Sequence, residues 1–268
     1  MNPIEDIDVA ELMPGAWRFK EKNINATFKG HIQPNDGEQI AAFVKVLTPR
    51  EIFIESVCAL LGRAAGLPIP KPYLVIMASD ALVDGADINV PLFGLEDASQ
   101  PSFRHLVTID EDTTDETILN AILIQLKKWN KLNGTILFDE LVLNDDRNIG
   151  NLLYDGSAEF TLIDHGRALR DPSSASQITS PNMMAGIVSG EELLSRKRRQ
   201  KHIETECLSH YSGRKYDLLA SKTKASGYNV KEDDIEFVIQ ILSDRINHIS
   251  QLLSQQLGLS TKQTALNL

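Results

Sequence analysis

Short stretches with strand character occupy the N-terminal part of the chain. Residues 16–19, 24–32 and 40–47 are rich in apolar side chains, and residues 34–37 (Pro-Asn-Asp-Gly) form a turn sequence before the third stretch. We predict that the three stretches form an antiparallel meander. Two further strands are predicted at residues 73–77 and 90–94.

Longer patterns with helical spacing follow. Thr48 is suited to cap a helix and Pro49 to its first turn. The apolar face of this helix comprises Ile52, Phe53, Val57, Leu60 and Leu61. Further helices are predicted between residues 110 and 129, from 136 to 143, from about residue 190, and from 231 to 258. We therefore predict a strand-rich N-terminal part and a mainly helical C-terminal part.

Residues 138–167 join four different features in one stretch. The apolar helix ends near Leu143, and a polar loop at residues 144–151 follows it. Two short strands at residues 152–154 and 160–163 flank an Asp-Gly turn, and the second strand leads to Asp164. We interpret the stretch as a loop and a hairpin that bring several polar side chains together.

The polar residues of this stretch suit phosphoryl transfer. A hydroxyl nucleophile needs a carboxylate to orient it and accept its proton, and magnesium on a triphosphate needs hard oxygen ligands. Asp146, Asn151 and Asp164 have the required side chains. The alternative is structural, because Asp and Asn are common in loops, where they make local turns.

The sequence N-x-D-R-x-x-x-N, followed by I-D-H-G, resembles the catalytic and metal-binding loops of the HipA-like kinases. It is also similar to the corresponding segments of phosphatidylinositol 3/4-kinases. The resemblance implies ATP and Mg²⁺ as cofactors, Asp146 as the catalytic aspartate, and Asn151 and Asp164 as metal ligands. It departs at Asn148, where the family often has His, and at His165, where D-F-G has Phe.

Lys45 lies inside an otherwise apolar strand, where an unpaired ammonium would be costly to bury. A kinase supplies two partners, the nucleotide phosphates and a glutamate on the following helix. Glu51 and Glu55 are both candidates; we favour Glu55, because Glu51 is placed to stabilise the helix N-terminus. The alternative for Lys45 is an edge-strand lysine whose ammonium reaches solvent.

The resemblance implies an α+β, two-lobed protein kinase-like fold, with a small antiparallel-sheet N-lobe (1–97) and a mainly helical C-lobe (98–268) in a single domain. Backbone groups near Phe93 and Glu96 would then meet adenine where the chain crosses between the lobes. A G-x-G-x-x-G phosphate loop is missing from residues 20–25, so backbone amides or lysine side chains would have to cover the phosphates. HipA-like and lipid kinases resemble each other in lacking the full glycine pattern. The missing glycine loop therefore argues against a conventional protein kinase more than against these two families.

Composition narrows the possible partners and the compartment. The formal net charge of −10 argues against general nucleic-acid binding and against anionic membranes. Cys58 and Cys207 are far apart and do not suggest a zinc site or a disulfide framework. The N-terminus lacks a secretion signal and no apolar run is long enough to span a membrane. We predict a cytoplasmic protein.

Two polar runs have open interpretations. The basic run at residues 195–201 is either a solvated helix face or a docking patch for an acidic partner or nucleic acid. The Ser-rich run at residues 171–177 occupies the place of an activation segment, but it is also typical of a plain loop.

We predict an ATP-dependent kinase similar to the HipA-like serine/threonine kinases. Its substrate would be a protein with a Ser or Thr hydroxyl, and a regulatory or antitoxin partner is possible for this family. The alternatives are a lipid or small-molecule kinase, a nucleotide-binding pseudokinase or regulatory module, and a kinase-like enzyme that transfers AMP.

Overall fold

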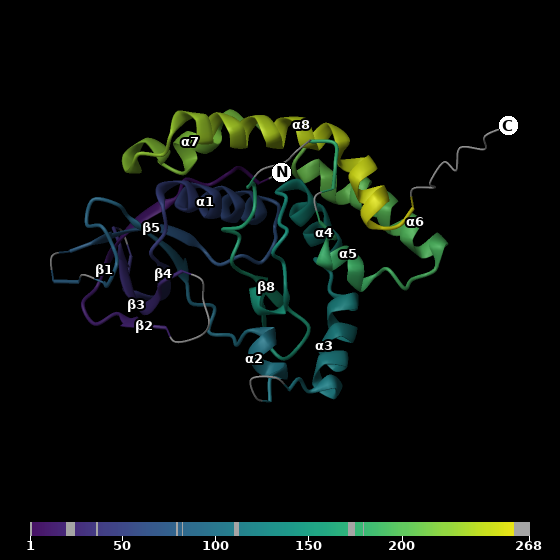
Figure 1. Ribbon diagram of the computed structural model, residues 1–268, viewed down its shortest axis with the longest axis horizontal. Helices are drawn as coiled ribbons and strands as arrows, with labels where there is room; N and C mark the ends of the chain where they lie inside the picture. Colours follow the sequence, from purple (N-terminus) through teal and green to yellow (C-terminus); the bar gives the residue numbers. More distant parts are fainter. Residues whose placement is uncertain are drawn as a thin grey trace.

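The computed structural model describes residues 2–19, 25–35, 37–78, 80–81, 83–109, 113–170, 175–178 and 180–259. A sheet formed by the N-terminal part of the chain lies at one side of the molecule, and most helices lie at the other (Figure 1). The expected phosphate cover at residues 20–24, residues 171–174 of the Ser-rich run, and residues 260–268 lie outside the described part.

The sheet closes on itself. Its strands are β1 (Asp8–Leu12), β2 (Trp17–Arg18), β3 (Thr27–Pro34), β4 (Ile40–Lys45), β5 (Pro72–Met77) and β6 (Leu92–Glu96). They follow the order β1-β5-β6-β4-β3-β2, and β1 also pairs with β3, so that β2 alone extends outside the ring. Alternate side chains of these strands fill the interior, among them Leu12, Phe28, Ile32, Val44 and Val75.

The predicted meander is present, since β2, β3 and β4 pair antiparallel in sequence order. β1 was not predicted, and it is the strand that pairs parallel, with β5. Together with the helical remainder, the sheet confirms the predicted α+β architecture, with the strands in the N-terminal part and most helices in the C-terminal part.

Helix α1 (Pro49–Ala64) lies against β5 and β6. Its N-terminus forms a capping box, in which the Thr48 hydroxyl accepts a hydrogen bond from the Glu51 amide and the Glu51 carboxylate accepts one from the Thr48 amide. Most of the helix is buried, including Ile52, Phe53, Val57 and Leu61. The capping box and the apolar face fix the direction of the helix across the sheet.

The helical part contains one small hairpin and helices of very different lengths. The hairpin is formed by β7 (Leu152–Tyr154) and β8 (Phe160–Leu162). The longer helices are α3 (Glu116–Lys128), α4 (Leu132–Leu141), α6 (Leu193–His202) and α8 (Glu232–Gln256). The shorter elements are α2 (Phe103–Val107), η1 (Ile149–Asn151), α5 (Met183–Ile187), η2 (Ile203–Cys207), η3 (Leu208–His210), η4 (Tyr216–Leu218), α7 (Leu219–Lys222) and η5 (Ala225–Tyr228). Within the described residues, no helix has both the length and the apolar character needed to cross a bilayer.

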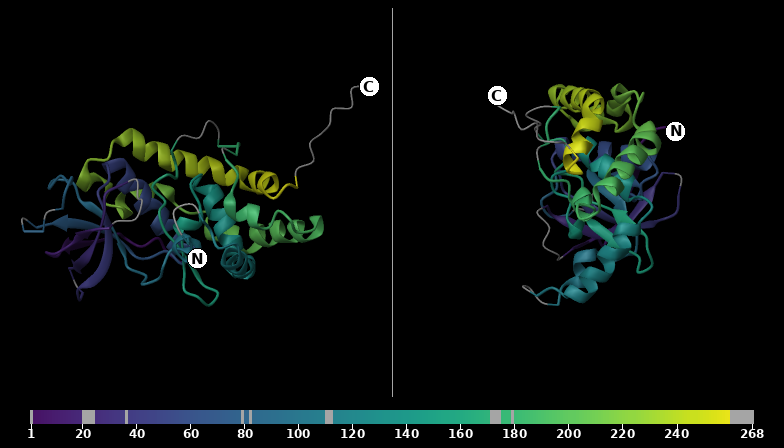
Figure 2. Two further views of the ribbon diagram at one scale, coloured as in Figure 1. Left: turned by 60° about the horizontal axis from the view of Figure 1, so that its bottom comes forward. Right: turned by 90° about the vertical axis from the view of Figure 1, so that its right-hand side faces the viewer.

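Helix α8 runs along both parts of the molecule (Figures 1 and 2). Near its start, Asp234 pairs with Arg50 of α1, with 2.9 Å between Oδ1 and Nε. In its middle, Arg245 is buried and pairs with Glu140 of α4 at 2.5 Å. The same guanidinium donates to the carbonyl oxygens of Ala175 and Gln177. The C-terminal helix therefore connects α1, α4 and the segment that follows the hairpin.

The basic run lies on α6, and part of it has internal partners. Arg196 donates to the Leu257 and Gly258 carbonyl oxygens, and Arg199 pairs with Glu191. Lys197 and Arg198 are exposed. Two of the cations that suggested a docking patch therefore hold α6 in place.

Candidate active site

A buried arginine organises the loop after α4. Arg147 forms a bidentate salt bridge with Asp139 of α4, with Nε–Oδ2 and Nη2–Oδ1 distances of 3.0 and 2.9 Å. Its Nη1 also donates to the carbonyl oxygens of Asn151 and Ile163, each at 3.1 Å. Because one guanidinium contacts α4, the loop and the end of β8, it holds these three segments in one arrangement.

Within the loop, side-chain amides hold the backbone at Asp146. Asn151 Nδ2 and Asn148 Nδ2 donate to the Asp146 carbonyl oxygen at 2.9 and 2.8 Å. Asn148 Oδ1 in turn accepts a hydrogen bond from the Gly150 amide at 2.8 Å. The bonds to Asp146 involve its backbone and not its carboxylate. The carboxylate forms a long ion pair with Arg167, with 3.7 Å between Oδ1 and Nη1.

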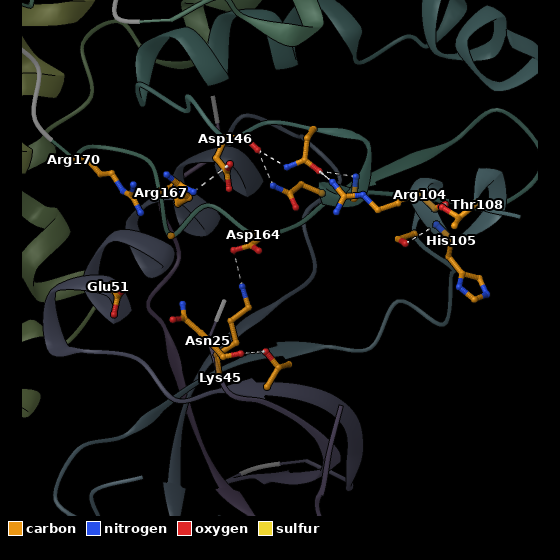
Figure 3. Close-up of a pocket in the computed structure, with 16 residues that line it drawn as sticks. Asn25, Lys45, Glu51, Arg104, His105, Thr108, Asp146, Asp164, Arg167 and Arg170 are labelled. Atoms are coloured by element: carbon orange, nitrogen blue, oxygen red, sulfur yellow. Dashed lines mark hydrogen bonds and ion pairs between the residues drawn. The ribbon is translucent and has the colours of Figure 1, made fainter. Parts of the chain in front are cut away.

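Asp164 directly follows the hairpin and has a left-handed backbone conformation, with φ of +59°. Asp adopts this region more readily than most residues. Its carboxylate is 44% exposed and accepts a hydrogen bond from Lys45 Nζ at 2.9 Å. Figure 3 shows Asp146 and Asp164 facing the same space from two segments, with Lys45 opposite Asp164.

Lys45 reaches from β4 to two carboxylates. Besides Asp164, its Nζ contacts Glu55 Oε1 at 2.8 Å, and the Glu55 side chain is 1% exposed. The Glu55 Oε2 atom accepts a hydrogen bond from the His165 amide at 2.9 Å. Glu55 of α1 thus joins the strand lysine to the segment that carries Asp164. Glu51, the other candidate, is engaged in the capping box.

The electrostatics of this group follow from burial and ion pairing. Burial lowers the pKa of Lys45, but the charges of Glu55 and Asp164 outweigh it, and the pKa is raised. Burial opposes ionisation of Asp164 as well, yet Lys45 lowers the pKa of this carboxyl below its ordinary value. Burial raises the pKa of Glu55. Lys45 therefore stays protonated between the two carboxylates.

Two connected cavities meet at these residues. One, of about 690 Å³, is lined by charged and polar side chains including Asp146, Arg104, Arg167 and Arg170. The other, of about 500 Å³, is more apolar and extends along residues 95–101, with contributions from Phe19, Phe43, Pro70 and Leu153. Lys45, Asn151 and Asp164 line both cavities. We call the more apolar cavity the inner chamber and the more polar cavity the outer chamber of one cleft.

The two residues proposed to flank adenine have different positions. Glu96 lines the inner chamber at the end of β6. Phe93 is fully buried in the hydrophobic core and lines neither chamber, so it contributes packing beneath this site. Residues 97–101, just beyond the predicted segment, line the inner chamber as well.

Several residues of the site were not predicted. Asp139 lies within an apolar helix, where the sequence gives no indication that it pairs with Arg147. Arg104 of α2 donates from Nη2 to Asn148 Oδ1 at 2.7 Å, across a separation of 44 residues. His165 is buried, packs edge-on against Phe138, and its Nε2 has no hydrogen-bond partner among the described residues. Burial and the nearby Arg147 charge lower the pKa of His165, so the ring is neutral.

The chain matches one protein-family model and is similar in fold to a solved kinase structure. Residues 30–206 match the family model described as HipA-like kinase. Among solved structures, the proinflammatory kinase CtkA of Helicobacter pylori is similar to this chain with a TM-score of 0.53. The match covers 97% of this chain and 100% of CtkA, at 16% sequence identity. No curated protein matches the chain.

Proposed function

Because the chain belongs to the HipA-like kinase family, as its loop motifs predicted, we propose that it is an ATP-dependent serine/threonine protein kinase. Membership of this family implies a kinase that uses a nucleotide. ATP as the nucleotide, a protein hydroxyl as the acceptor and the roles of the individual residues are part of the proposal.

The observation that carries this proposal is the position of Lys45. It joins Glu55 of α1 to Asp164 after the hairpin, at the point where the two chambers meet. In a kinase this lysine binds nucleotide phosphates and the helix glutamate keeps it in place. The adenine ring would occupy the inner chamber beside Glu96, and the phosphates would lie between Lys45 and the loop at residues 146–151.

We assign to Asp146 the role of orienting the acceptor, and its surroundings support this assignment. Its carboxylate faces the outer chamber, and its backbone is held by Asn148 and Asn151. A hydroxyl placed there would donate to this carboxylate and transfer its proton as the bond to phosphorus forms. The loop contacts reduce the freedom of Asp146 before the acceptor arrives.

The oxygen donors fit magnesium bound together with a nucleotide. Among the described residues there is no group of three or more His, Cys, Asp or Glu side chains that could hold a metal by itself. Mg²⁺ at nucleotide sites uses one or two protein oxygens and completes its shell with phosphates and water. Asn151 and Asp164 supply an amide oxygen and a carboxylate at the cleft, and the ion would neutralise charge on the phosphates.

Intact-mass measurement of the purified protein with Mg²⁺ and ATP tests this function. We expect a gain of about 80 Da per modified site, the mass of one phosphoryl group, and no gain when EDTA removes the metal. If the protein requires a separate acceptor, the same gain should appear on a generic Ser/Thr protein substrate. A gain of one AMP unit would instead identify nucleotidyl transfer. Nucleotide-dependent thermal stabilisation without any transfer would identify a pseudokinase.

Glu55 and Glu51 offer a matched pair of substitutions on one helix. We expect Glu55→Gln to lower the rate of phosphoryl transfer about 100-fold, because Lys45 loses its charged partner in α1. Glu51→Gln should leave the rate within about twofold and lower stability by less than about 1 kcal/mol, since Glu51 caps the helix while Lys45 pairs with Glu55 and Asp164. Initial rates and urea unfolding of both variants check this. Equal rate losses would contradict the assignment of Glu55.

A further inference from the structure

The outer chamber contains more positive charge than the proposed nucleotide chemistry uses. Three arginines line it and do not line the inner chamber: Arg104 from α2, and Arg167 and Arg170 from the segment after Asp164. Figure 3 shows Arg167 beside Asp146, Arg170 further out on the same side, and Arg104 on the opposite side. The three guanidinium groups therefore surround the place where the acceptor hydroxyl would meet Asp146.

These guanidinium groups have capacity left for a ligand. The Arg167 side chain is 41% exposed, and its ion contact with Asp146 is 3.7 Å long. Arg104 binds a neutral amide oxygen, that of Asn148. Arg170 is exposed, and its side chain forms no ion pair within the described part of the chain. Planar guanidinium groups bind carboxylates and phosphates through paired N–H donors.

The carboxylates in the chamber do not balance this charge. Glu51 is held by the Thr48 capping box, and Asp164 is paired with Lys45. Asp146 remains as the facing anion, against three arginines. A local cationic region is notable on a chain with a formal net charge of −10, because such regions attract anionic ligands.

We infer that the acceptor is a protein segment whose Ser or Thr hydroxyl is flanked by acidic residues. The hydroxyl would meet Asp146, while carboxylates on either side of it would bind Arg170 and Arg167 on one side and Arg104 on the other. This inference rests on the proposed function, since it names the substrate class of the same site.

Two synthetic peptide mixtures, each with one central Ser, test the inference. In one, every flanking position is drawn from Ala and Glu; in the other, from Ala and Lys. We expect kcat/KM for phosphate transfer to be about tenfold higher for the Glu mixture. The Arg170→Glu variant should bring the two values close together, because it places a carboxylate where the acceptor carries carboxylates.

The control is Arg198→Glu, the same change at an exposed residue of α6, which should keep the wild-type preference. KM for ATP is measured in every variant. Equal use of both mixtures by the wild type, or a preference that survives in Arg170→Glu, would overturn the inference. So would an Arg170→Glu defect confined to KM for ATP, which would assign the arginine to the nucleotide.

The two proposals fail in different ways. A protein that phosphorylates itself with Mg²⁺ and ATP but modifies neither mixture would remain a kinase, and the inferred acceptor class would be wrong. A protein that gains no phosphate, modifies neither mixture and hydrolyses no ATP would overturn the proposed function and the inference with it.

Discussion

The Asp146→Asn variant is expected to lose phosphoryl transfer by about 1000-fold while it retains nucleotide binding. An amide cannot accept the hydroxyl proton, but it has nearly the shape of the carboxylate. The loop should keep its structure, because Asn148 and Asn151 bind the backbone carbonyl of residue 146 rather than its side chain. Single-turnover rates, with nucleotide affinity measured by calorimetry, separate the two effects.

Asp145→Asn is the control for this substitution. It makes the same chemical change one residue earlier, at an exposed side chain that lines neither chamber. We expect its transfer rate to stay within about twofold of the wild type. Full activity of Asp146→Asn would show that another group accepts the proton, and equal losses in both variants would indicate a general effect of charge.

The Asp139→Leu variant is expected to lower the free energy of unfolding by about 4 kcal/mol. Asp139 and Arg147 are both buried, and their side chains are each 1% exposed. Removing the carboxylate leaves the guanidinium in the interior without its charged partner. Urea unfolding at neutral pH, with the slope compared between variants, measures the change.

The double variant Asp139→Leu/Arg147→Met distinguishes loss of the pair from general disruption. The double variant contains no unpaired charge at this position, so its free energy of unfolding should be about 2 kcal/mol higher than that of Asp139→Leu. Some loss should remain, because the Arg147 side chain also satisfies the carbonyl oxygens of Asn151 and Ile163. A double variant that is no more stable than Asp139→Leu would argue against a coupled pair.

The sequence predicted the parts of the site whose residues are close together in the chain. Asp146 and Asn151 share one loop, and the hairpin that leads to Asp164 is short, so turn chemistry and strand pattern place them without further information. Family membership is confirmed by the comparisons. The roles of the individual residues remain predictions that the variants above test.

Features that depend on distant contacts could not be predicted in the same way. β1 is a five-residue strand with two acidic residues, and its parallel partner β5 begins about 60 residues later. The sequence favoured Glu55 over Glu51 as the partner of Lys45, but the 2.8 Å ion pair itself depends on how β4 and α1 pack together. Arg104 is separated from its partner by 44 residues, and nothing near it in the sequence marks it as part of the cleft.

The long C-terminal helix has a consequence for where an autonomous folding unit ends. The family match stops at residue 206, within η2. Beyond that point, Asp234 holds Arg50 of α1, the helix that carries Glu55, and Arg245 neutralises the buried Glu140. A fragment truncated at residue 206 would keep every proposed catalytic side chain and still lack the contacts that fix α1 and α4. We therefore expect the minimal stable unit to extend through α8, beyond the residues that match the family.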